Sequence, residues 1–386
     1  MSCIAFIDYM ENNNLMEKRV LVVATVPSTI GQFNMNNISI LRKIGYAVDI
    51  AADFTDTSVW PVERTIKFKQ DMAEMGIACW QLDFSRSPFK IGKHFKAYSE
   101  VLNLIKERNY SFIHTHTPIA SAVVRMATHK TGTKVIYTAH GFHFFKGAPL
   151  RNWIAFYPFE KYLSKYTDVL VTITREDYSR ALKKFRAKRI EYIPGVGVDR
   201  DKFSHSEKAR IKIRKELGIA DSQCMLLSVG ELNDNKNHEI VIKAISGLEY
   251  VYVIVGKGVL KDKLEKKANS LGVSLKTVGY RNDVADFYSA ADAYILPSKR
   301  EGLNVSLMEA MSSGLPVACG NIRGNTDLIE DEDCLFSPDS IEEVKRAILT
   351  VVENKQRLAR KNICRIMDFE KELVCEKTRH IYESLS

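Results

Sequence analysis

Short apolar runs alternate with amphipathic segments along most of this 386-residue chain. An apolar run of roughly four to eight residues is typical of a buried strand, and apolar residues three or four apart are typical of a helix. Their regular alternation predicts an α/β fold, with parallel sheets wrapped by helices. We expect strands at 20–26, 46–52, 112–116, 134–140 and 168–174, and again at 225–230, 250–256, 274–279, 293–297 and 315–319.

The strand pattern pauses once, at the glycine- and proline-containing segment 192–199, and then restarts. Because a chain of this length exceeds one ordinary core, we predict two similar α/β domains. Their expected bounds are 18–197 and 198–386, after an N-terminal extension at 1–17. The helical pattern of 341–385 ends the second domain, and its last helix could pack back on the first.

The composition agrees with a globular protein of the reducing cytoplasm. Hydrophobic residues make up 45% and charged residues 27% of the chain, as in ordinary soluble domains. The seven cysteines are scattered and never form a Cys-x-x-Cys pair, so neither a zinc site nor a disulfide framework is indicated. We expect a cytoplasmic protein, because no signal-peptide pattern or membrane-spanning apolar run is present.

Positive charge is concentrated in the first half of the chain. Residues 1–200 carry 28 Lys and Arg against 18 Asp and Glu, a net charge of +10, whereas residues 201–386 carry 28 against 29, a net charge of −1. This predicts an anionic partner for the first half: nucleic acid, phospholipid or a diphosphate ligand. The basic segment 180–189 lacks a recognisable nucleic-acid module around it, so we predict a solvated helix face and no nucleic-acid partner.

Loops that directly follow strands are the first candidates for ligand binding, because open parallel sheets bind ligands at the carboxyl ends of their strands. Gly31 lies in the first such loop, ahead of a helix expected to begin near Asn34, where glycine and a helix start would suit phosphate. A plain strand-to-helix turn is the alternative. His140 follows the strand at 134–140 and could present its imidazole to a substrate, or could be a structural histidine.

Lys236 is the candidate after the strand that ends at Gly230. We expect it in the first turn of a helix that begins around Asn235. A cation opposes the helix dipole at that position, so an anionic ligand would explain the lysine. A solvated lysine is the alternative.

The stretch SKREGLNVSLMEAM (298–311) holds two glutamates, Glu301 and Glu309, with seven residues between them. The chain turns after the strand at 293–297 and enters a helix near Asn304, so the N–H groups of Gly302–Asn304 should favour an anion. Glu301 lies on the loop. Glu309 lies among apolar helix residues, where an acid needs polar partners or access to a cleft. A capping or core-satisfied pair of acids is the alternative.

Together these loops resemble the family 4 retaining glycosyltransferases of the GT-B fold, from about Lys18 to near the end of the chain. The Glu, seven residues, Glu spacing of EGLNVSLMEA is the most specific match. TAHGFHFFKGAP (138–149), followed by PFEKYLSKYTDVLVTIT (158–174), resembles members that build capsular, exopolysaccharide or other glycan chains on polyprenyl-diphosphate lipids. The resemblance implies two Rossmann-like doubly wound domains facing a central cleft, the first binding the acceptor and the second a nucleotide sugar, commonly UDP-linked.

The resemblance also implies roles for single residues. Glu301 would hydrogen-bond the hydroxyls of the donor sugar, and Glu309 those of the ribose. Lys236 would stabilise the negative charge that develops on the leaving diphosphate, and His140 would face the donor sugar. The other implied donor-binding positions are Gly31, Tyr280, Arg281, Gly302, Leu303 and Asn304.

One donor-binding position departs from the family pattern. Many relatives place an arginine directly after the glycine where this chain has Glu231. Lys236 then lacks that cationic partner at the diphosphate. Arg281, Arg300 and Arg323 are the candidates for a second positive charge.

We expect retention through front-face attack by the acceptor hydroxyl, because one of the two acids is assigned to the ribose rather than to a covalent intermediate. No metal or other cofactor is expected, since Lys236 and the helix start supply positive charge. The segment 331–333 matches a metal-binding DxD pattern, but its acidic loop setting favours plain surface.

Aromatic and basic residues interleave at 84–98 and 142–162, a pattern that favours docking on an anionic membrane. Packing between helix and sheet is the alternative. We expect peripheral docking at the inner face of the cell membrane, where a lipid-linked saccharide acceptor would be available. The rival functions are a UDP-sugar epimerase of the same architecture and a non-catalytic nucleotide-sugar-binding subunit. The residues concerned are Phe84, Phe89, Phe95, Arg86, Lys90, Lys93, Lys96, Trp153, Phe156, Tyr157 and Phe159.

Overall fold

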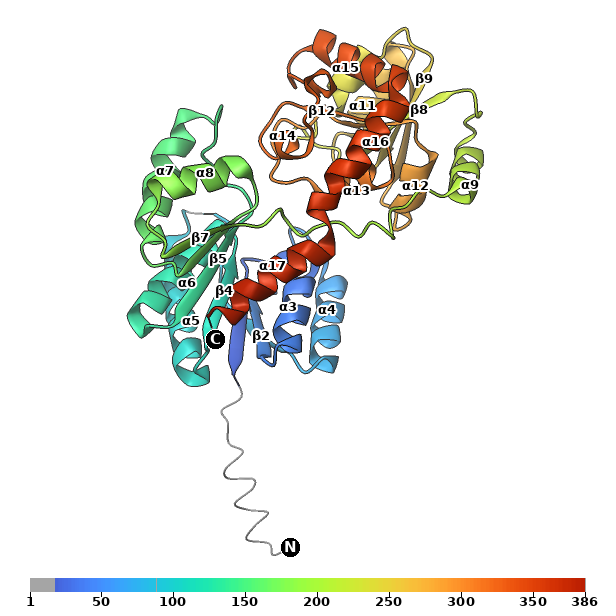
Figure 1. The fold of residues 1–386 in the computed structure, drawn as a ribbon. Helices are drawn as coiled ribbons and strands as arrows, with labels where there is room; N and C mark the ends of the chain where they lie inside the picture. The colour runs from blue at the N-terminus through green and yellow to red at the C-terminus, as the bar shows by residue number, and fades with distance from the viewer. Residues whose placement is uncertain (1–17, 88, 386) are drawn as a thin grey trace, which may run out of the picture. The chain divides into compact units, whose positions relative to one another are not determined.

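The computed structural model describes residues 18–87 and 89–385, so the predicted extension at 1–17 lies outside the described residues. The chain divides into two compact units, each an α/β sandwich (Figure 1). Among the described residues, unit 1 comprises the chain up to Thr172, Asp177–Ile193 and the C-terminal residues from Cys375. Unit 2 comprises Ile173–Glu176 and Pro194–Val374.

Unit 1 is built on a seven-stranded parallel sheet with the order β3-β2-β1-β4-β5-β6-β7. The strand order reverses between β1 and β4, and such a reversal is where doubly wound sheets bind their ligands. The strands are β1 (Arg19–Val23), β2 (Ala47–Ala52), β3 (Ala78–Gln81), β4 (Phe112–His116), β5 (Lys134–Ala139), β6 (Val169–Thr172) and β7 (Arg189–Tyr192). The helices are α2 (Pro27–Phe33), α3 (Met35–Lys43), α4 (Val62–Glu74), α5 (Ile91–Arg108), α6 (Pro118–Thr131), α7 (Leu150–Ser164) and α8 (Arg175–Lys184).

Unit 2 is built on a six-stranded parallel sheet with the order β10-β9-β8-β11-β12-β13, which reverses between β8 and β11. Its strands are β8 (Cys224–Val229), β9 (Tyr250–Val255), β10 (Ser274–Gly279), β11 (Ala293–Leu296), β12 (Val317–Gly320) and β13 (Leu335–Phe336). The helices are α9 (Glu207–Leu217), α10 (His238–Ala244), α11 (Lys261–Ser270), α12 (Val284–Ala290), α13 (Val305–Ser312), α14 (Asn325–Leu328), α15 (Ile341–Glu353) and α16 (Lys355–Ile366), with 3-10 turns η1 (Glu332–Cys334) and η2 (Met367–Phe369). The last helix, α17 (Lys371–Glu383), begins in unit 2, and its residues from Cys375 belong to unit 1.

The central strands are buried on both faces, which explains why their sequences are almost wholly apolar. All ten strands predicted from apolar runs are present. Three further strands, β3, β7 and β13, were not predicted. β3 and β7 lie at the edges of their sheet and mix polar with apolar residues, and β13 has two residues, so none forms a recognisable apolar run.

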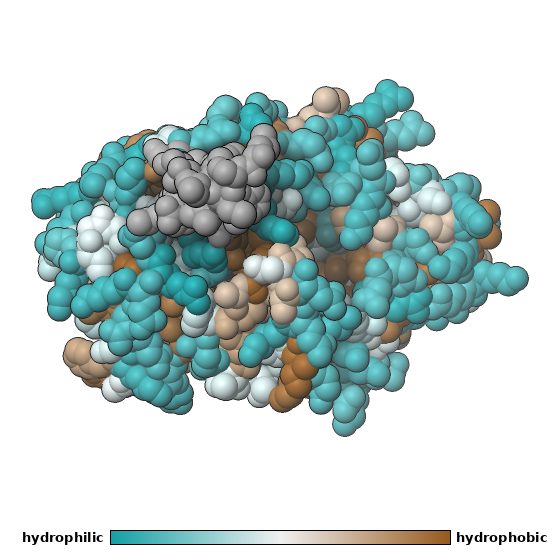
Figure 2. Space-filling view, turned by 90° about the horizontal axis from the view of Figure 1, so that it is seen from below, coloured by the Kyte–Doolittle hydropathy of each residue, from teal (hydrophilic) through white to brown (hydrophobic). Residues whose placement is uncertain are grey.

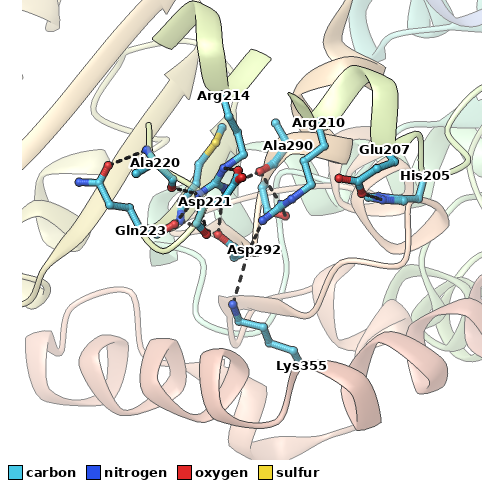
Figure 3. Close-up of polar contacts among 12 residues, drawn as sticks. His205, Glu207, Arg210, Arg214, Ala220, Asp221, Gln223, Ala290, Asp292 and Lys355 are labelled. Carbon is cyan, nitrogen blue, oxygen red and sulfur yellow. Dashed lines mark hydrogen bonds and ion pairs between the residues drawn. The ribbon is translucent and has the colours of Figure 1, made fainter. Parts of the chain in front are cut away.

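A buried arginine fixes the start of the unit 2 sheet (Figure 3). Arg214 of α9 is 1% exposed, and its guanidinium donates to the carbonyls of Ala290, Ala220 and Gln223 and to the Asp292 carboxylate. Asp292 also accepts from the Met225 amide at 2.8 Å. Burial raises the pKa of Asp292, but the amide and the surrounding cations outweigh this and hold it below its usual value.

The C-terminal end of α17 belongs to unit 1. There Tyr382 is fully buried and stacks on Phe112 of β4, with ring centroids 5.7 Å apart. In the described part of the chain, no helix has the combined length and apolar character needed to cross a membrane.

Candidate functional site

The candidate site in unit 2 is centred on an ion pair between two loops at the carboxyl ends of β8 and β11. Nζ of Lys236 lies 2.6 Å from Oε1 of Glu301. The two side chains are only 17% and 14% exposed, so water screens their attraction less than on an open surface. The structure therefore brings together two residues that the sequence placed on separate loops.

Asparagines hold these two loops together. The side chain of Asn235 donates to the carbonyl of Arg300 at 3.0 Å, and the Lys299 amide donates to the carbonyl of Asn235 at 2.8 Å. Asn237 donates to the carbonyls of Pro297 and Pro338. Because the backbone on both sides is tied, the Lys236 ammonium and the Glu301 carboxylate are held in place before any ligand arrives.

The expected position of Lys236 within a helix was wrong. Asn237 has φ of 55°, a left-handed conformation that interrupts the turn, and α10 begins only at His238. Lys236 lies in the turn before the helix, with its amide bonded to Oδ1 of Asn233 at 3.0 Å. Its charge is balanced by Glu301 rather than left opposing a helix dipole.

Glu309 lies on α13, one helix turn beyond the loop that carries Glu301. The hydroxyl of Tyr288 donates to its Oε2 at 2.9 Å. Burial raises the pKa of Glu309 above its ordinary value, although the Tyr288 hydroxyl and the charge of Lys202 oppose this rise. The carboxylate can accept further hydrogen bonds from a ligand, since only one oxygen is occupied in this contact.

Asn304 caps α13, so the helix starts near this residue as predicted. Its Oδ1 accepts from the Leu307 amide at 3.0 Å and from the Ser306 hydroxyl at 2.7 Å. Leu303 is buried. The carbonyl of Gly302 lies so close to Gly324 that a Cβ on Gly324 would be 1.8 Å away. The loop from Gly302 to Asn304 is thus fixed by backbone packing and by the cap.

The remaining donor-binding candidates of unit 2 lie in different surroundings. Tyr280 is 61% exposed. Arg281 binds Glu216 at 2.7 Å and Asp283 at 2.8 Å, so its charge is already compensated by two carboxylates. Glu231 is exposed and accepts from Asn233. Of the candidates for a second cation at the diphosphate, Arg281 is therefore disfavoured.

Gly31 occupies a helix rather than the expected loop. It lies inside α2, and a Cβ added to it would be 2.4 Å from the ring of Trp60. This short helix is formed by the sequence PSTIGQF (27–33), and Pro27 lies at its first position, where proline is favoured. Close packing against Trp60 accounts for the glycine without a ligand.

His140 follows β5, as predicted, and two further histidines lie behind it. His114 and His116 of β4 were not singled out from the sequence, although the alternating FIHTH motif placed them on one face of a predicted strand. Nδ1 of His116 lies 3.1 Å from Nε2 of His140. Burial lowers the pKa of His140 to about 4 and that of His114 to about 3, so these imidazoles are neutral near pH 7.

A second missed feature is the pair of glycines after β9. A Cβ on Gly256 would be 1.8 Å from the carbonyl of Gly230, and one on Gly258 would be 2.3 Å from that of Leu232. Only glycine permits the loop after β9 to pack so closely on the loop that leads to Lys236. The signal was present as Gly-Lys-Gly directly after a strand.

The predicted basic and aromatic surface is divided between core and solvent. Phe84, Phe142 and Phe144 are buried, so the packing alternative holds for them. Trp153, Phe156 and Tyr157 pack partly buried against that core. Phe89 and Phe95 are 88% and 70% exposed. In the acidic segment 331–333, Glu332 and Asp333 are exposed, whereas Asp331 is partly buried and pairs with Arg357 and Lys361.

Two family models match the chain. Residues 209–364 match the model described as glycosyl transferases group 1, and residues 41–202 match the one described as glycosyltransferase family 4. EpsD of Bacillus subtilis, named as a glycosyltransferase, is 31% identical over 328 residues, which cover 82% of this chain and 82% of EpsD.

Another relative and a solved structure extend the similarity. The Escherichia coli UDP-Gal:alpha-D-GlcNAc-diphosphoundecaprenol alpha-1,3-galactosyltransferase is 29% identical over 279 residues, 68% of this chain and 72% of that one. Anabaena HepE in complex with UDP and glucose superposes with a TM-score of 0.76 at 18% identity, covering 95% of this chain and 100% of HepE. The predicted fold of two Rossmann-like domains is confirmed.

Proposed function

The chain belongs to the family 4, group 1 glycosyltransferases of the GT-B fold, and we propose that it transfers a sugar, with retention, from a UDP-linked donor to a hydroxyl of a saccharide acceptor. The observation that carries this proposal is the ion pair of Lys236 and Glu301 at the carboxyl edge of the unit 2 sheet. This position is where doubly wound sheets bind nucleotides.

In the proposed reaction the donor separates the ion pair, and each of its two charged groups then binds the donor. Glu301 accepts hydrogen bonds from hydroxyls of the donor sugar, and Lys236 turns its ammonium to the diphosphate. As the bond between the anomeric carbon and the diphosphate oxygen breaks, negative charge grows on the leaving group. A fixed cation stabilises that charge more in the transition state than in the ground state, which accelerates the reaction.

The acceptor hydroxyl attacks from the face that the diphosphate leaves. Its oxygen forms the new glycosidic bond, and its proton passes to the departing phosphate oxygen, so the anomeric configuration is retained. Glu309 holds the ribose hydroxyls, and the backbone of Gly302–Asn304 adjoins the sugar and diphosphate. Lys236 supplies the positive charge in this scheme, and activity should persist when divalent metals are chelated.

For the acceptor we propose a glycan linked to a polyprenyl diphosphate, in the assembly of a surface polysaccharide such as capsule or exopolysaccharide. The similarity to the Escherichia coli galactosyltransferase, which is named for a diphosphoundecaprenol acceptor, supports this class. The enzyme would work at the cytoplasmic face of the membrane, on which unit 1 docks.

Exposed side chains of unit 1 support this docking. Phe89, Ile91 and Phe95 are 88%, 62% and 70% exposed at the start of α5, beside the exposed Lys90. Leu150 and Ile154 of α7 are also exposed. Hydrophobic residues occur among the mainly hydrophilic ones on the face shown in Figure 2. Apolar side chains and a nearby cation together favour the boundary of an anionic bilayer.

The test is a screen of nucleotide sugars for transfer to polyprenyl-diphosphate-linked saccharides. The wild-type protein should transfer sugar from one class of donor to these acceptors, and Glu301→Ala should lose most of this transfer activity. Glu342→Ala, a change of an exposed acid at the start of α15, is the matched control and should stay active. Transfer undiminished in Glu301→Ala would contradict the site. Conversion of the donor without acceptor would indicate an epimerase, and binding without turnover a non-catalytic subunit.

A further inference from the structure

Three histidines of unit 1 form a continuous array at the carboxyl ends of two neighbouring strands. His114 and His116 lie two residues apart on β4, so their rings share a face of the sheet. Their ring centroids are 4.2 Å apart, and those of His116 and His140 are 5.3 Å apart. His140 is the member that, by the family resemblance, would face the donor sugar.

The ring nitrogens of the array differ in their partners. Nδ1 of His114 lies 2.8 Å from the hydroxyl of Tyr382, and its Nε2 lies 2.8 Å from that of Thr138. His116 uses Nδ1 toward Nε2 of His140 at 3.1 Å, while its own Nε2 is buried and has no hydrogen-bond partner among the described residues. His116 as a whole is 1% exposed.

The contact between His116 and His140 requires one proton between the two nitrogens. If His140 donated from Nε2, a neutral His116 would carry its proton on Nε2 and bury an N–H with no acceptor. If His116 donates from Nδ1, its Nε2 buries only a lone pair. Orphaned buried N–H groups are rarer than under-satisfied acceptors, so the second arrangement is favoured.

We propose that His116 is a positioning residue, which donates from Nδ1 to Nε2 of His140 and so holds His140 in the tautomer that carries its proton on Nδ1. The hydrogen bond made by one ring nitrogen decides the state of the other. His140 then presents an N–H donor from Nδ1, which suits an oxygen of a bound sugar nucleotide. This last step rests on the proposed function, whereas the tautomer does not.

Burial keeps the array neutral, which the assignment needs. It lowers the pKa of His116 well below the ordinary value, with the neighbouring histidines adding to the effect, and lowers that of His140 as well. With two neutral rings, the single shared proton defines the tautomer of both. The ring of Phe33, 6.0 Å from that of His140, packs beside it as an apolar neighbour.

The test is ¹⁵N NMR of the full chain labelled on histidine, in which protonated and bare ring nitrogens resonate apart. In wild type at pH 7.5, His140 should show a protonated Nδ1 and a bare Nε2. His116→Leu removes the donor, and His140 should become a mixture of tautomers. His116→Asn keeps an amide nitrogen near the former Nδ1 and should restore the wild-type pattern. A wild-type His140 protonated on Nε2 would overturn the proposal.

Two further measurements separate positioning from general damage to the fold. His114→Gln alters the array without touching the bond to His140 and should leave its tautomer unchanged; a shift equal to that of His116→Leu would contradict the role of that bond. If transfer is detected, His116→Leu should lower kcat/KM about 10-fold, as expected for loss of one oriented hydrogen bond. The same change in a His140→Leu background should then have little effect, and a full additional loss would overturn the coupling.

Discussion

At the scale of single residues, the ammonium of Lys236 and the carboxylate of Glu301 meet at 2.6 Å although 65 positions separate them in the chain. Neither is placed by its own element alone. Lys236 lies in a turn before α10, and Glu301 on a loop before α13, and asparagine side chains join the two loops. A partly buried charge is costly unless it has a partner. Each residue of this pair therefore needs a new partner when the ion pair separates, and a bound ligand can supply both.

Replacement of Lys236 should affect turnover far more than substrate binding. We expect Lys236→Ala to lower kcat by about 10²–10³-fold, the range measured for loss of one preorganised charge-stabilising group, with KM changed little. Lys266→Ala, which removes an exposed lysine of α11, should retain full activity. Steady-state kinetics of both variants check this, and an equal effect on kcat in the two would contradict the role of Lys236.

Candidate residues at strand ends could be identified from the sequence, because open parallel sheets bind ligands at the carboxyl ends of their strands. A strand end can be located along the chain without knowledge of which side chains are in contact. Lys236, Glu301 and His140 follow predicted strands and were found in this way. His116 was missed because a histidine inside a strand gives no signal until the neighbouring strand is known. The predicted helix start around Asn235 was also wrong, since the left-handed conformation of Asn237 is not evident from residue type alone.

At the scale of elements, the apolar runs identify the central strands and leave the edges uncertain. Central strands are buried on both sides and must be apolar, whereas β3 and β7 each have one unpaired edge and tolerate polar residues. The helices matter less for chemistry than the loops that precede them. The buried guanidinium of Arg214 shows how one side chain on α9 ties the connections before β8 and β11.

Loss of this guanidinium should destabilise the protein strongly. We expect Arg214→Met to lower the free energy of unfolding by about 3–5 kcal/mol, since it removes the buried cation beside the Asp292 carboxylate and leaves the carbonyls of Ala220 and Gln223 without this donor. Arg210→Met removes a more exposed neighbour of the same carboxylate and should cost about 1 kcal/mol or less. Thermal unfolding of the two variants compares them. Equal, small changes would show that Arg214 does not hold these elements together.

The histidines of β4 should make the stability of the protein fall in mild acid. Burial lowers the pKa of His114 from 6.5 to about 3, so below pH 6.5 the unfolded chain binds a proton that the folded chain refuses. The free energy of unfolding should therefore decrease with falling pH, by up to about 1.4 kcal/mol per pH unit for each such histidine. Urea unfolding at pH 7.5 and pH 5.5 should show a smaller decrease for His114→Gln than for wild type. The same decrease in both would contradict this prediction.

In the molecule as a whole, the two units share an architecture, but the two halves of the chain differ in net charge. The net charge of +10 for residues 1–200 and −1 for residues 201–386 comes from the sequence alone, and so does the repetition of the strand pattern that predicts two domains. Which aromatic residues reach solvent could not be predicted, because Phe84 and Phe89 occur in one short segment and only the second is exposed. Composition does not determine the face on which a loop residue lies.

Membrane docking should depend on the exposed residues at the start of α5. We expect Phe89→Ser combined with Phe95→Ser to weaken binding to vesicles that contain phosphatidylglycerol. Added salt should weaken binding of the wild type, because each basic residue near the bilayer contributes about 1 kcal/mol of electrostatic attraction. Val259→Ser removes a side chain in unit 2 that is 92% exposed and should change nothing. Vesicle sedimentation measures all three proteins. Binding that ignores anionic lipid, salt and both phenylalanines would exclude docking through α5.

A crystal structure of the protein with UDP would show whether a nucleotide binds where Lys236 and Glu301 meet. We predict the diphosphate within hydrogen-bonding distance of the Lys236 ammonium, with the ribose hydroxyls bound by Glu309 on α13. A nucleotide bound elsewhere, with Lys236 still paired only to Glu301, would show that these two residues do not form the donor site.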